Sequence, residues 1–188
     1  MALKTVAEVI SAFDNDSIQF LFFWGHQPAI GGGVTQSCLS QWYDCTFSVD
    51  GVIYHTAEQY MMAQKAHLFG DEETLEKIMS ANHPRAYKQL GRTVRGYNEK
   101  VWKERREEIV KTGNLNKFGQ NSRLRRFLLE TDDFVLVEAS PYDRIWGIGM
   151  YADDPYARDP RQWRGQNLLG FALMDVRETL RKKGAGVS

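Results

Sequence analysis

The sequence has few cysteines and no excess of charge of either sign. Its 188 residues include only two thiols, Cys38 and Cys45, and neither they nor the four histidines show metal-ligand spacing. Two idle or buried thiols are typical of a reducing compartment, so we expect a cytoplasmic protein without a metal. The 24 basic and 24 acidic residues cancel, which argues against binding long nucleic acids or membrane surfaces through overall charge.

Long apolar runs are also missing. The longest, Phe20 to Trp24, is far below the roughly 20 residues of a membrane-spanning helix, and the N-terminus lacks the pattern of a secretory signal. Glycines 31–33 are not followed by the Gly-Lys-Ser/Thr of a phosphate-binding loop, so we expect a lid or a plain connector there. The 43% of hydrophobic residues suffices for one core. We therefore expect a short N-terminal extension with a helix over residues 1–17 and one domain over residues 18–188.

The residue pattern predicts an α+β fold that is mostly helical and has a small antiparallel sheet. Apolar residues recur at helical steps in seven segments: residues 4–13, 56–70, 71–81, 84–90, 98–113, 122–130 and 167–183. Strands are expected at 18–24 and 134–139, and Asp50-Gly51 between two β-prone runs predicts a hairpin within 44–55. Residues 91–96 are expected to be a connector. The long loop 140–165 has no periodicity, and such loops are often functional.

The segment Thr56–Gly70 is marked as a helix at both ends. Thr56 can cap the first turn while Gln59 bonds back in a capping box, and Gly70 suits the left-handed closing position. One helical face is expected to hold apolar residues together with one acid and one amine: Glu58, Met61, Met62, Lys65, Leu68 and Phe69.

The charged pair on this face needs partners or a purpose, because burying an unpaired charge is costly. At a rise of roughly 1.5 Å per residue, the Cα atoms of Glu58 and Lys65 lie about 10 Å apart, too far for an adjacent-turn ion pair. Two long side chains at this spacing can close on a group the size of a sugar. The alternative is a partly exposed face with a dipole-stabilised glutamate and a lysine that extends to solvent.

Several segments in order resemble the NADAR (YbiA-like) family. The resemblance covers roughly residues 18–183 and rests on these motifs: Phe-Phe-Trp-Gly-His at 22–26, Leu-Ser-Gln-Trp at 39–42, Thr-Ala-Glu-Gln-Tyr-Met-Met-Ala-Gln-Lys at 56–65, Leu-Gly-Arg at 90–92, Trp102, Lys117-Phe118 with Asn121, Asp-Arg-Ile-Trp-Gly-Ile-Gly at 143–149 and Gly-Gln-Asn-Leu-Leu-Gly at 165–170.

The resemblance implies an N-glycosidase that cleaves the bond between ribose and an exocyclic amine of a base. Implied substrates are phosphoribosylamino intermediates of riboflavin synthesis and ADP-ribosylated guanine. Glu58 and Lys65 fall on the family's catalytic glutamate and lysine. Some members carry Asp where this chain has Ile148, so no role of an acid at that position can be carried over.

Substrate-binding positions are expected around this pair, namely Trp24, Gly25, Ser40, Gln41, Arg92, Asp143, Trp146, Gly147 and Asn167. Arg92 and Arg95 suit phosphate, since guanidinium groups match phosphate oxygens. Trp146-Gly147 can stack a base or ribose, and Asp143 can bind ribose hydroxyls. The structural alternatives are solvation for the arginines, loop anchoring for Trp146, a turn cap for Asp143 and a helix cap for Asn167.

Two mechanisms fit these residues. A lysine with a lowered pKa can add to C1 of a ring-opened ribosylamine and form a Schiff base, while Glu58 moves protons and holds the ribose. In the other mechanism Glu58 activates water and Lys65 acts only through its charge. Neither needs a cofactor. A non-catalytic sensor of ADP-ribose or another nucleotide is the main alternative function, and a helical interaction scaffold is a third.

Overall fold

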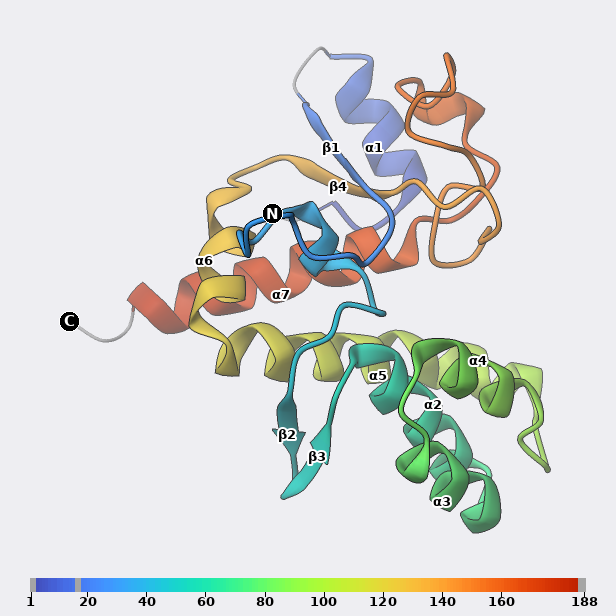
Figure 1. Ribbon diagram of the computed structural model, residues 1–188. Helices are drawn as coiled ribbons and strands as arrows, with labels where there is room; N and C mark the ends of the chain where they lie inside the picture. Colours follow the sequence, from blue (N-terminus) through green and yellow to red (C-terminus); the bar gives the residue numbers. More distant parts are fainter. Residues whose placement is uncertain (1–2, 16–17, 186–188) are drawn as a thin grey trace. The chain divides into compact units, whose positions relative to one another are not determined.

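The computed structural model describes residues 3–15 and 18–185, which form two compact units (Figure 1). One unit contains the described residues up to Ser40 together with those from Ser122 onwards, and the other is Gln41–Asn121. The boundary expected between residues 17 and 18 falls at Asp16 and Ser17, which lie outside the described residues. None of the helices in the described chain is both long and apolar enough to cross a lipid bilayer.

The first unit is built around two parallel strands. Strand β1 (Phe20–Phe23) pairs with β4 (Val135–Glu138) in the register Phe20 to Val135 and Phe23 to Glu138. The helix α7 (Leu168–Ala185) packs on β4, α6 (Ser122–Glu130) packs on α7, and α1 (Val6–Phe13) lies beside the short 3₁₀ helix η2 (Pro160–Gln162). Figure 1 shows β1 and β4 side by side. Val135, Leu136 and Val137 are all buried, as expected for a parallel strand that is covered on both faces.

The second unit joins a hairpin to four helices. Strands β2 (Phe47–Val49) and β3 (Val52–Tyr54) form the predicted antiparallel pair, and Asp50 and Gly51 at its turn both have positive φ, at 50° and 81°. Helix α2 (Ala57–Leu68) contacts the other three helices, which are α3 (Glu72–Ser80), α4 (Pro84–Arg92) and α5 (Glu99–Gln120). The fold class is therefore the predicted one, a mostly helical α+β protein with a small antiparallel sheet.

Two predicted boundaries were wrong because glycines were interpreted as helix ends. Helix α5 does not stop at Gly113 but continues to Gln120, and Gly91 and Arg92 belong to α4 rather than to a connector. A Cβ atom on Gly113 would lie 2.5 Å from Cδ1 of Tyr60, and one on Gly91 would overlap Sδ of Met62. These glycines let α5 and α4 approach α2 closely. They serve packing between helices instead of chain termination.

Helix α2 itself is buried on more than the predicted face. Met61 and Met62 are buried as expected, but so are Tyr60, Ala63 and Ala66 on the other sides. Residues 57–63 of this helix are buried on all sides, whereas the last turn reaches solvent and His67 is exposed. The polar residues of α2 are therefore the ones that point to a functional site.

Candidate active site

The first turn of α2 holds Glu58 in a buried position, with 4% of its surface exposed. The main-chain N–H of Glu58 donates to the carbonyl oxygen of Gln41 over 2.9 Å. Thr56 caps the helix as predicted, because its Oγ1 accepts from the N–H of Gln59 over 3.0 Å. The expected capping box is only half right, since Oε1 of Gln59 accepts from the N–H of His55 rather than from that of Thr56. The helix dipole at this end favours an ionised Glu58.

Gln41 reaches a second helix through its side chain. Nδ2 of Asn114 on α5 donates to Oε1 of Gln41 over 2.7 Å and to the carbonyl of Val110 over 2.9 Å. Both side chains are buried, and neither Nε2 of Gln41 nor Oδ1 of Asn114 has a partner among the described residues. Gln41, a predicted site residue, therefore fixes the main chain at Glu58 and keeps one buried donor. The sequence motifs gave no signal for Asn114.

Lys65, two turns further along α2, is half-buried among aromatic rings. Its Nζ donates to the carbonyl oxygen of Gly91 over 2.7 Å and lies 4.4 Å from the ring centre of Tyr97 and 5.6 Å from that of Trp102. Burial lowers the pKa of the Lys65 amine below its ordinary value. Neither ring was among the predicted site residues, and Trp102 is also buried, with 8% of its surface exposed.

The environment of Lys65 suits an amine that changes charge during a reaction. Loss of hydration favours the neutral form, which is the nucleophile, while the ring faces and the Gly91 carbonyl stabilise the ammonium form. A lysine in such surroundings can act either as a nucleophile or as a positive charge. Both predicted mechanisms are compatible with it.

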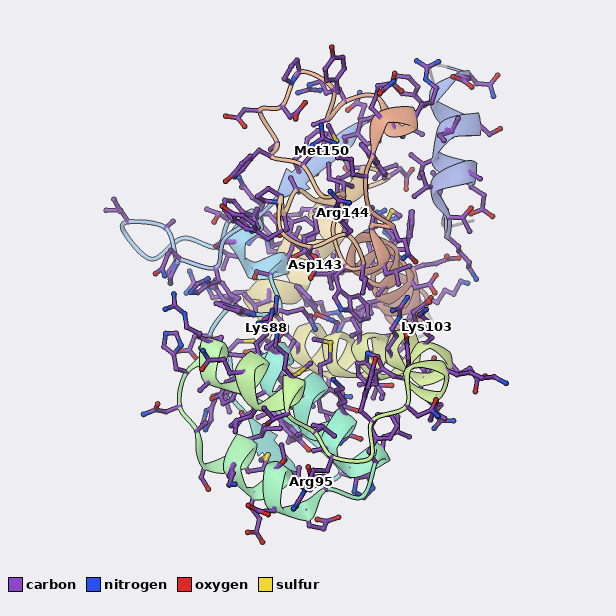
Figure 2. The ribbon with its side chains drawn as sticks, turned by 90° about the vertical axis from the view of Figure 1, so that its right-hand side faces the viewer. Lys88, Arg95, Lys103, Asp143, Arg144 and Met150 are labelled. Atoms are coloured by element: carbon purple, nitrogen blue, oxygen red, sulfur yellow. The ribbon has the colours of Figure 1, made fainter. Side chains whose placement is uncertain are left out.

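The two candidate phosphate-binding arginines have different surroundings. Arg95 is bound to Asp71 through Nε at 3.1 Å and Nη2 at 2.6 Å, and it also pairs with Glu73 at 3.0 Å. Arg92 ends α4 next to Gly91, is exposed, and forms no ion pair or side-chain hydrogen bond with the rest of the described chain. Arg92 is therefore available for an anion. Arg95, labelled in Figure 2, therefore holds Asp71 and Glu73, a structural role that differs both from phosphate binding and from the expected alternative of solvation.

In the other unit, predicted site residues gather where the parallel strands end. Trp24 and Gly25 directly follow β1, and Asp143 and Trp146 lie in the loop that follows β4. Ligands commonly bind beyond the carboxyl ends of parallel strands. Oδ1 of Asp143 accepts from the N–H groups of Ile145 at 2.9 Å and Trp146 at 2.8 Å. Its Oδ2 has no hydrogen-bond partner among the described residues, so one oxygen shapes the loop and the other can meet a ligand.

The remaining predicted residues of this unit have mainly structural surroundings. Asn167 is fully buried, and its Oδ1 accepts from the N–H of Glu138 while its Nδ2 donates to the carbonyl of Leu136. Its two polar groups are thus used by β4. A Cβ on Gly147 would lie 2.7 Å from the Glu138 carbonyl, so packing against β4 explains this glycine. Ile148 is buried in the core, where no acid would be tolerated without a partner.

Ser40 lies at the end of the 3₁₀ helix η1 (Gln36–Leu39), where its N–H donates to the carbonyl of Ser37 over 3.1 Å. It is half-buried. Within each unit, then, the structure brings together part of the predicted set: Glu58 with Gln41, Lys65 with the Gly91-Arg92 pair, and Trp24 and Gly25 with the loop of Asp143. No group of three His, Cys, Asp or Glu side chains in the described chain is arranged to hold a metal ion.

Comparison with known proteins identifies the family to which the chain belongs. The NADAR domain matches residues 22–181 of the chain. This chain belongs to the NADAR family. A relative named N-glycosidase R617, from Acanthamoeba polyphaga mimivirus, is 42% identical over 165 residues, which cover 85% of this chain and 95% of the viral protein. N-glycosidase YbiA of Escherichia coli is 33% identical over 132 residues, covering 70% of this chain and 74% of YbiA.

The fold is shared as well. The NMR structure of E. coli YbiA superposes with a TM-score of 0.73 at 27% identity, covering 90% of this chain and 89% of YbiA. Riboflavin biosynthesis protein VVA0006 of Vibrio vulnificus is 32% identical over 144 residues, which cover 77% of this chain but only 35% of that protein. The family and its named members place the chain among the N-glycosidases.

Proposed function

We propose that this NADAR protein hydrolyses the bond between C1 of a ribosyl group and an exocyclic amine of a base, with Lys65 as nucleophile and Glu58 as proton carrier and ribose anchor. The ribosyl group is phosphoribosyl or ADP-ribosyl. The observation that carries this proposal is the position of the Lys65 amine, which is half-buried, held at 2.7 Å by the Gly91 carbonyl and flanked by the rings of Tyr97 and Trp102. A surface lysine that merely solvates its helix has no such enclosure.

The proposed reaction balances without a cofactor. The ring-opened ribosylamine presents C1 as an imine, and the neutral Lys65 amine adds to it. Ionised Glu58 takes a proton from the Lys65 nitrogen as this nitrogen adds, and it passes the proton to the nitrogen of the base as the C1–N bond breaks. C1 then remains bound to Lys65 as a Schiff base. Water adds to C1 with Glu58 as base, which releases the sugar and restores the amine. The net change is one water consumed per base released.

Other residues would orient the substrate. Arg92, whose guanidinium has no partner in the described chain, suits a phosphate group. Gln41 supports the turn that carries Glu58. The names of the relatives, which include N-glycosidases and a riboflavin biosynthesis protein, support the glycosidase activity and the link to riboflavin intermediates, whereas the ADP-ribosyl class rests on the family resemblance. We propose that residues 18–188 form the catalytic domain and that the protein acts in the cytoplasm on small ribosylated molecules, with ADP-ribosylated nucleic acid as a further substrate.

Borohydride trapping tests the covalent step. The protein is incubated with a phosphoribosylaminopyrimidine or with ADP-ribosyl-guanosine, reduced, digested and analysed by mass spectrometry. We expect a sugar adduct on Lys65 that is absent from Lys65→Ala. Lys88→Ala is the matched control, since Lys88 also lies near an aromatic ring, 5.9 Å from the centre of Trp42. Turnover without any adduct on Lys65 would eliminate the Schiff base and leave the direct attack of water.

The same incubation tests the activity itself. An enzyme releases free base, and Glu58→Gln lowers the release by about 100-fold or more while the melting temperature stays close to that of the unchanged protein. A sensor binds ADP-ribose, as seen in a thermal shift, but releases nothing from either compound. Absence of both release and thermal shift would refute the proposed function.

A further inference from the structure

The hairpin of the second unit has one edge that is closed by side chains and one that is open (Figure 1). On the outer edge of β2, the side chain of Gln120 binds the main chain of Ser48 as a neighbouring strand would. Oε1 of Gln120 accepts from the N–H of Ser48 over 2.9 Å, and Nε2 donates to the Ser48 carbonyl over 2.7 Å. Just before β2, Nδ2 of Asn121 donates to the carbonyl of Thr46 over 3.2 Å. The end of α5 therefore closes this edge.

The outer edge of β3 has no such cover. The turn at residues 50–51 has positive φ at both positions, as in a two-residue hairpin loop. In such a hairpin the residues next to the turn exchange hydrogen bonds, and the following pair points its main-chain groups outwards. That following pair is Ser48 and Ile53, and the bonds from Gln120 to Ser48 agree with this direction. Ile53 therefore presents its N–H and carbonyl at the open edge, and no residue of the described chain bonds to either group.

Strand β3 also lacks the features that protect a free edge. Its sequence is Val-Ile-Tyr, without a proline or a charged residue, and Val52 and Ile53 are 43% and 57% exposed. Natural proteins usually cover a free edge or interrupt it with Lys, Pro or a bulge, because an uninterrupted edge pairs readily with another chain. An apolar edge with a free donor and a free acceptor is the arrangement that accepts an added strand.

A groove borders β3 and extends to the helices α2 and α3. Its volume is about 500 Å³, and apolar side chains from the hairpin and from α3 line it, among them Val52, Leu75 and Met79. His67 of α2 also lines the groove and lies about 160° around the helix from Lys65, at 3.6 residues per turn. The groove is therefore a different site from the one around Lys65.

The charges of the groove suit a basic occupant. Two carboxylates, those of Asp50 and Glu76, are among its lining groups, and the lining contains neither lysine nor arginine. Neither carboxylate forms an ion pair with another residue of the described chain. A second copy of the chain is a poorer occupant, because its own β3 is paired with β2, whereas α2 and α3 bound the groove here. A single extended segment needs less room.

We propose that the open edge of β3 and this groove together bind an extended, basic peptide segment of a partner protein. The main chain of the segment pairs with the N–H and carbonyl of Ile53. An aliphatic side chain of the segment enters the groove, and a Lys or Arg of the segment pairs with Asp50 and Glu76. This inference does not depend on the proposed function, since it concerns another side of α2.

Two short peptides of opposite charge test the surface on the full chain. The probes are acetyl-Lys-Val-Lys-Val-Lys-amide and acetyl-Glu-Val-Glu-Val-Glu-amide, titrated into the ¹⁵N-labelled protein and followed by NMR. We expect the lysine peptide to bind at least about 10-fold more tightly than the glutamate peptide. The amide signal of Ile53 should shift on binding, and its hydrogen exchange should slow, because its N–H becomes hydrogen-bonded.

Two variants separate the edge from the charges. Ile53→Pro removes the outward N–H at a position where a strand edge tolerates proline, and we expect the lysine peptide to bind about 10-fold or more weakly. Glu76→Lys reverses one charge of the groove and should weaken the same peptide about 3-fold or more. Glu72→Lys is the matched control, because Glu72 is exposed on the same helix but does not line the groove.

The proposal is overturned if neither peptide binds, if both bind equally well, or if Glu76→Lys and Glu72→Lys have the same effect. Full affinity in a folded Ile53→Pro variant would also overturn it. If this variant does not fold, the Ile53 amide signal and the two glutamate variants decide. A dimer of the unchanged protein in sedimentation that Ile53→Pro converts to a monomer would assign the edge to a second copy of the chain and refute a foreign peptide.

Discussion

At the scale of single residues, Lys65 is shaped by opposing effects. Its burial lowers the pKa of the amine, whereas the Gly91 carbonyl at 2.7 Å and the Tyr97 ring at 4.4 Å stabilise the ammonium form. Burial prevails, so the neutral form is more populated near neutral pH than in an ordinary lysine. The neighbouring groups keep the side chain in place in either charge state.

The pH dependence of adduct formation follows from this shift. Only the neutral amine adds to C1, and its fraction grows as pH rises through the folded-state pKa, which lies below the ordinary 10.5. We expect the single-turnover rate of borohydride-trappable adduct to rise with pH and level off with an inflection below 10.5. Rapid-quench measurements between about pH 6 and pH 11 give this rate as a function of pH. An inflection at or above 10.5 would contradict a nucleophilic Lys65.

The two oxygens of Asp143 can be separated by substitution. Asp143→Asn keeps an acceptor for the N–H groups of Ile145 and Trp146 but removes the charge, while Asp143→Ala removes both. We expect Asp143→Asn to leave the free energy of unfolding nearly unchanged. Asp143→Ala should reduce the free energy of unfolding by about 1–2 kcal/mol. Urea unfolding measures both variants, and an equal loss of stability in the two would show that the charge itself holds the loop.

At the scale of elements, the second unit depends on the close approach of α5 to α2 at Gly113. Tyr60, which faces this glycine, is buried and also contacts Tyr54 edge to face at 5.0 Å, so it cannot move aside. The interface between α5 and α2 therefore has room for the hydrogen atom of Gly113 but not for a side chain. This explains why a residue with poor helix propensity lies inside a helix of 22 residues.

Replacement of this glycine should be costly although alanine is the better helix former. Gly113→Ala places a methyl group 2.5 Å from Cδ1 of Tyr60, and we expect a loss of about 1–3 kcal/mol in the free energy of unfolding. Gly184→Ala in α7 is the control, because its nearest neighbour would be Nη2 of Arg125 at an ordinary 3.5 Å. It should be neutral or stabilise by up to about 1 kcal/mol. Similar unfolding curves for both variants would refute tight packing at Gly113.

A buried carboxylate joins α3 to the segment between α4 and α5. Asp71 caps α3 through Thr74 and accepts three hydrogen bonds from Arg95, two from its guanidinium and one from its N–H. The Arg95 side chain, the Arg95 N–H and Thr74 hold the pKa of this carboxyl far below its usual range. A carboxyl with a lowered folded-state pKa contributes stability above its unfolded pKa, and this contribution is lost as pH falls below that value.

The contribution of Asp71 to the stability of the folded protein should therefore disappear in acid. At pH 7 we expect Asp71→Asn to lower the melting temperature by roughly 3–8 °C. The difference from the unchanged protein should shrink as pH falls from about 5 to 3, since the unfolded carboxyl titrates near 3.9. Calorimetric melts across this range test it, with the exposed Glu76→Gln on the same helix as control. A difference that stays constant with pH would mean that geometry, not charge, makes Asp71 important.

At the scale of the whole molecule, charge balance limits what the protein can bind. With 24 basic and 24 acidic residues, binding to an unmodified polyanion has little electrostatic support. We expect a dissociation constant for an unmodified single-stranded oligonucleotide of about 100 µM or weaker at physiological salt, with weak salt dependence. Fluorescence anisotropy with a labelled oligonucleotide measures this. Tight binding with a steep salt dependence would contradict this prediction and indicate a local basic patch on a protein whose net charge is zero.

The amino-acid sequence by itself determined the features that depend on near neighbours and on motif order. Thr56 and Asn98 cap their helices, Asp50-Gly51 makes the hairpin turn, and the order of the motifs indicated the NADAR family. Each depends on a few consecutive residues or on their order along the chain. Such signals can be interpreted without knowing which segments meet.

Tertiary structure alone decided the features that depend on segments distant in the chain. The parallel pairing of β1 with β4 joins strands that are more than 100 residues apart in the sequence, and this pairing brings Trp24 beside Tyr142 and Tyr151. Gly113 was misinterpreted because Tyr60, which requires it, lies on another helix. The partners of Lys65 likewise come from α4, α5 and the segment between them. Periodicity and propensity describe how a segment folds, whereas contacts between segments decide what its side chains meet.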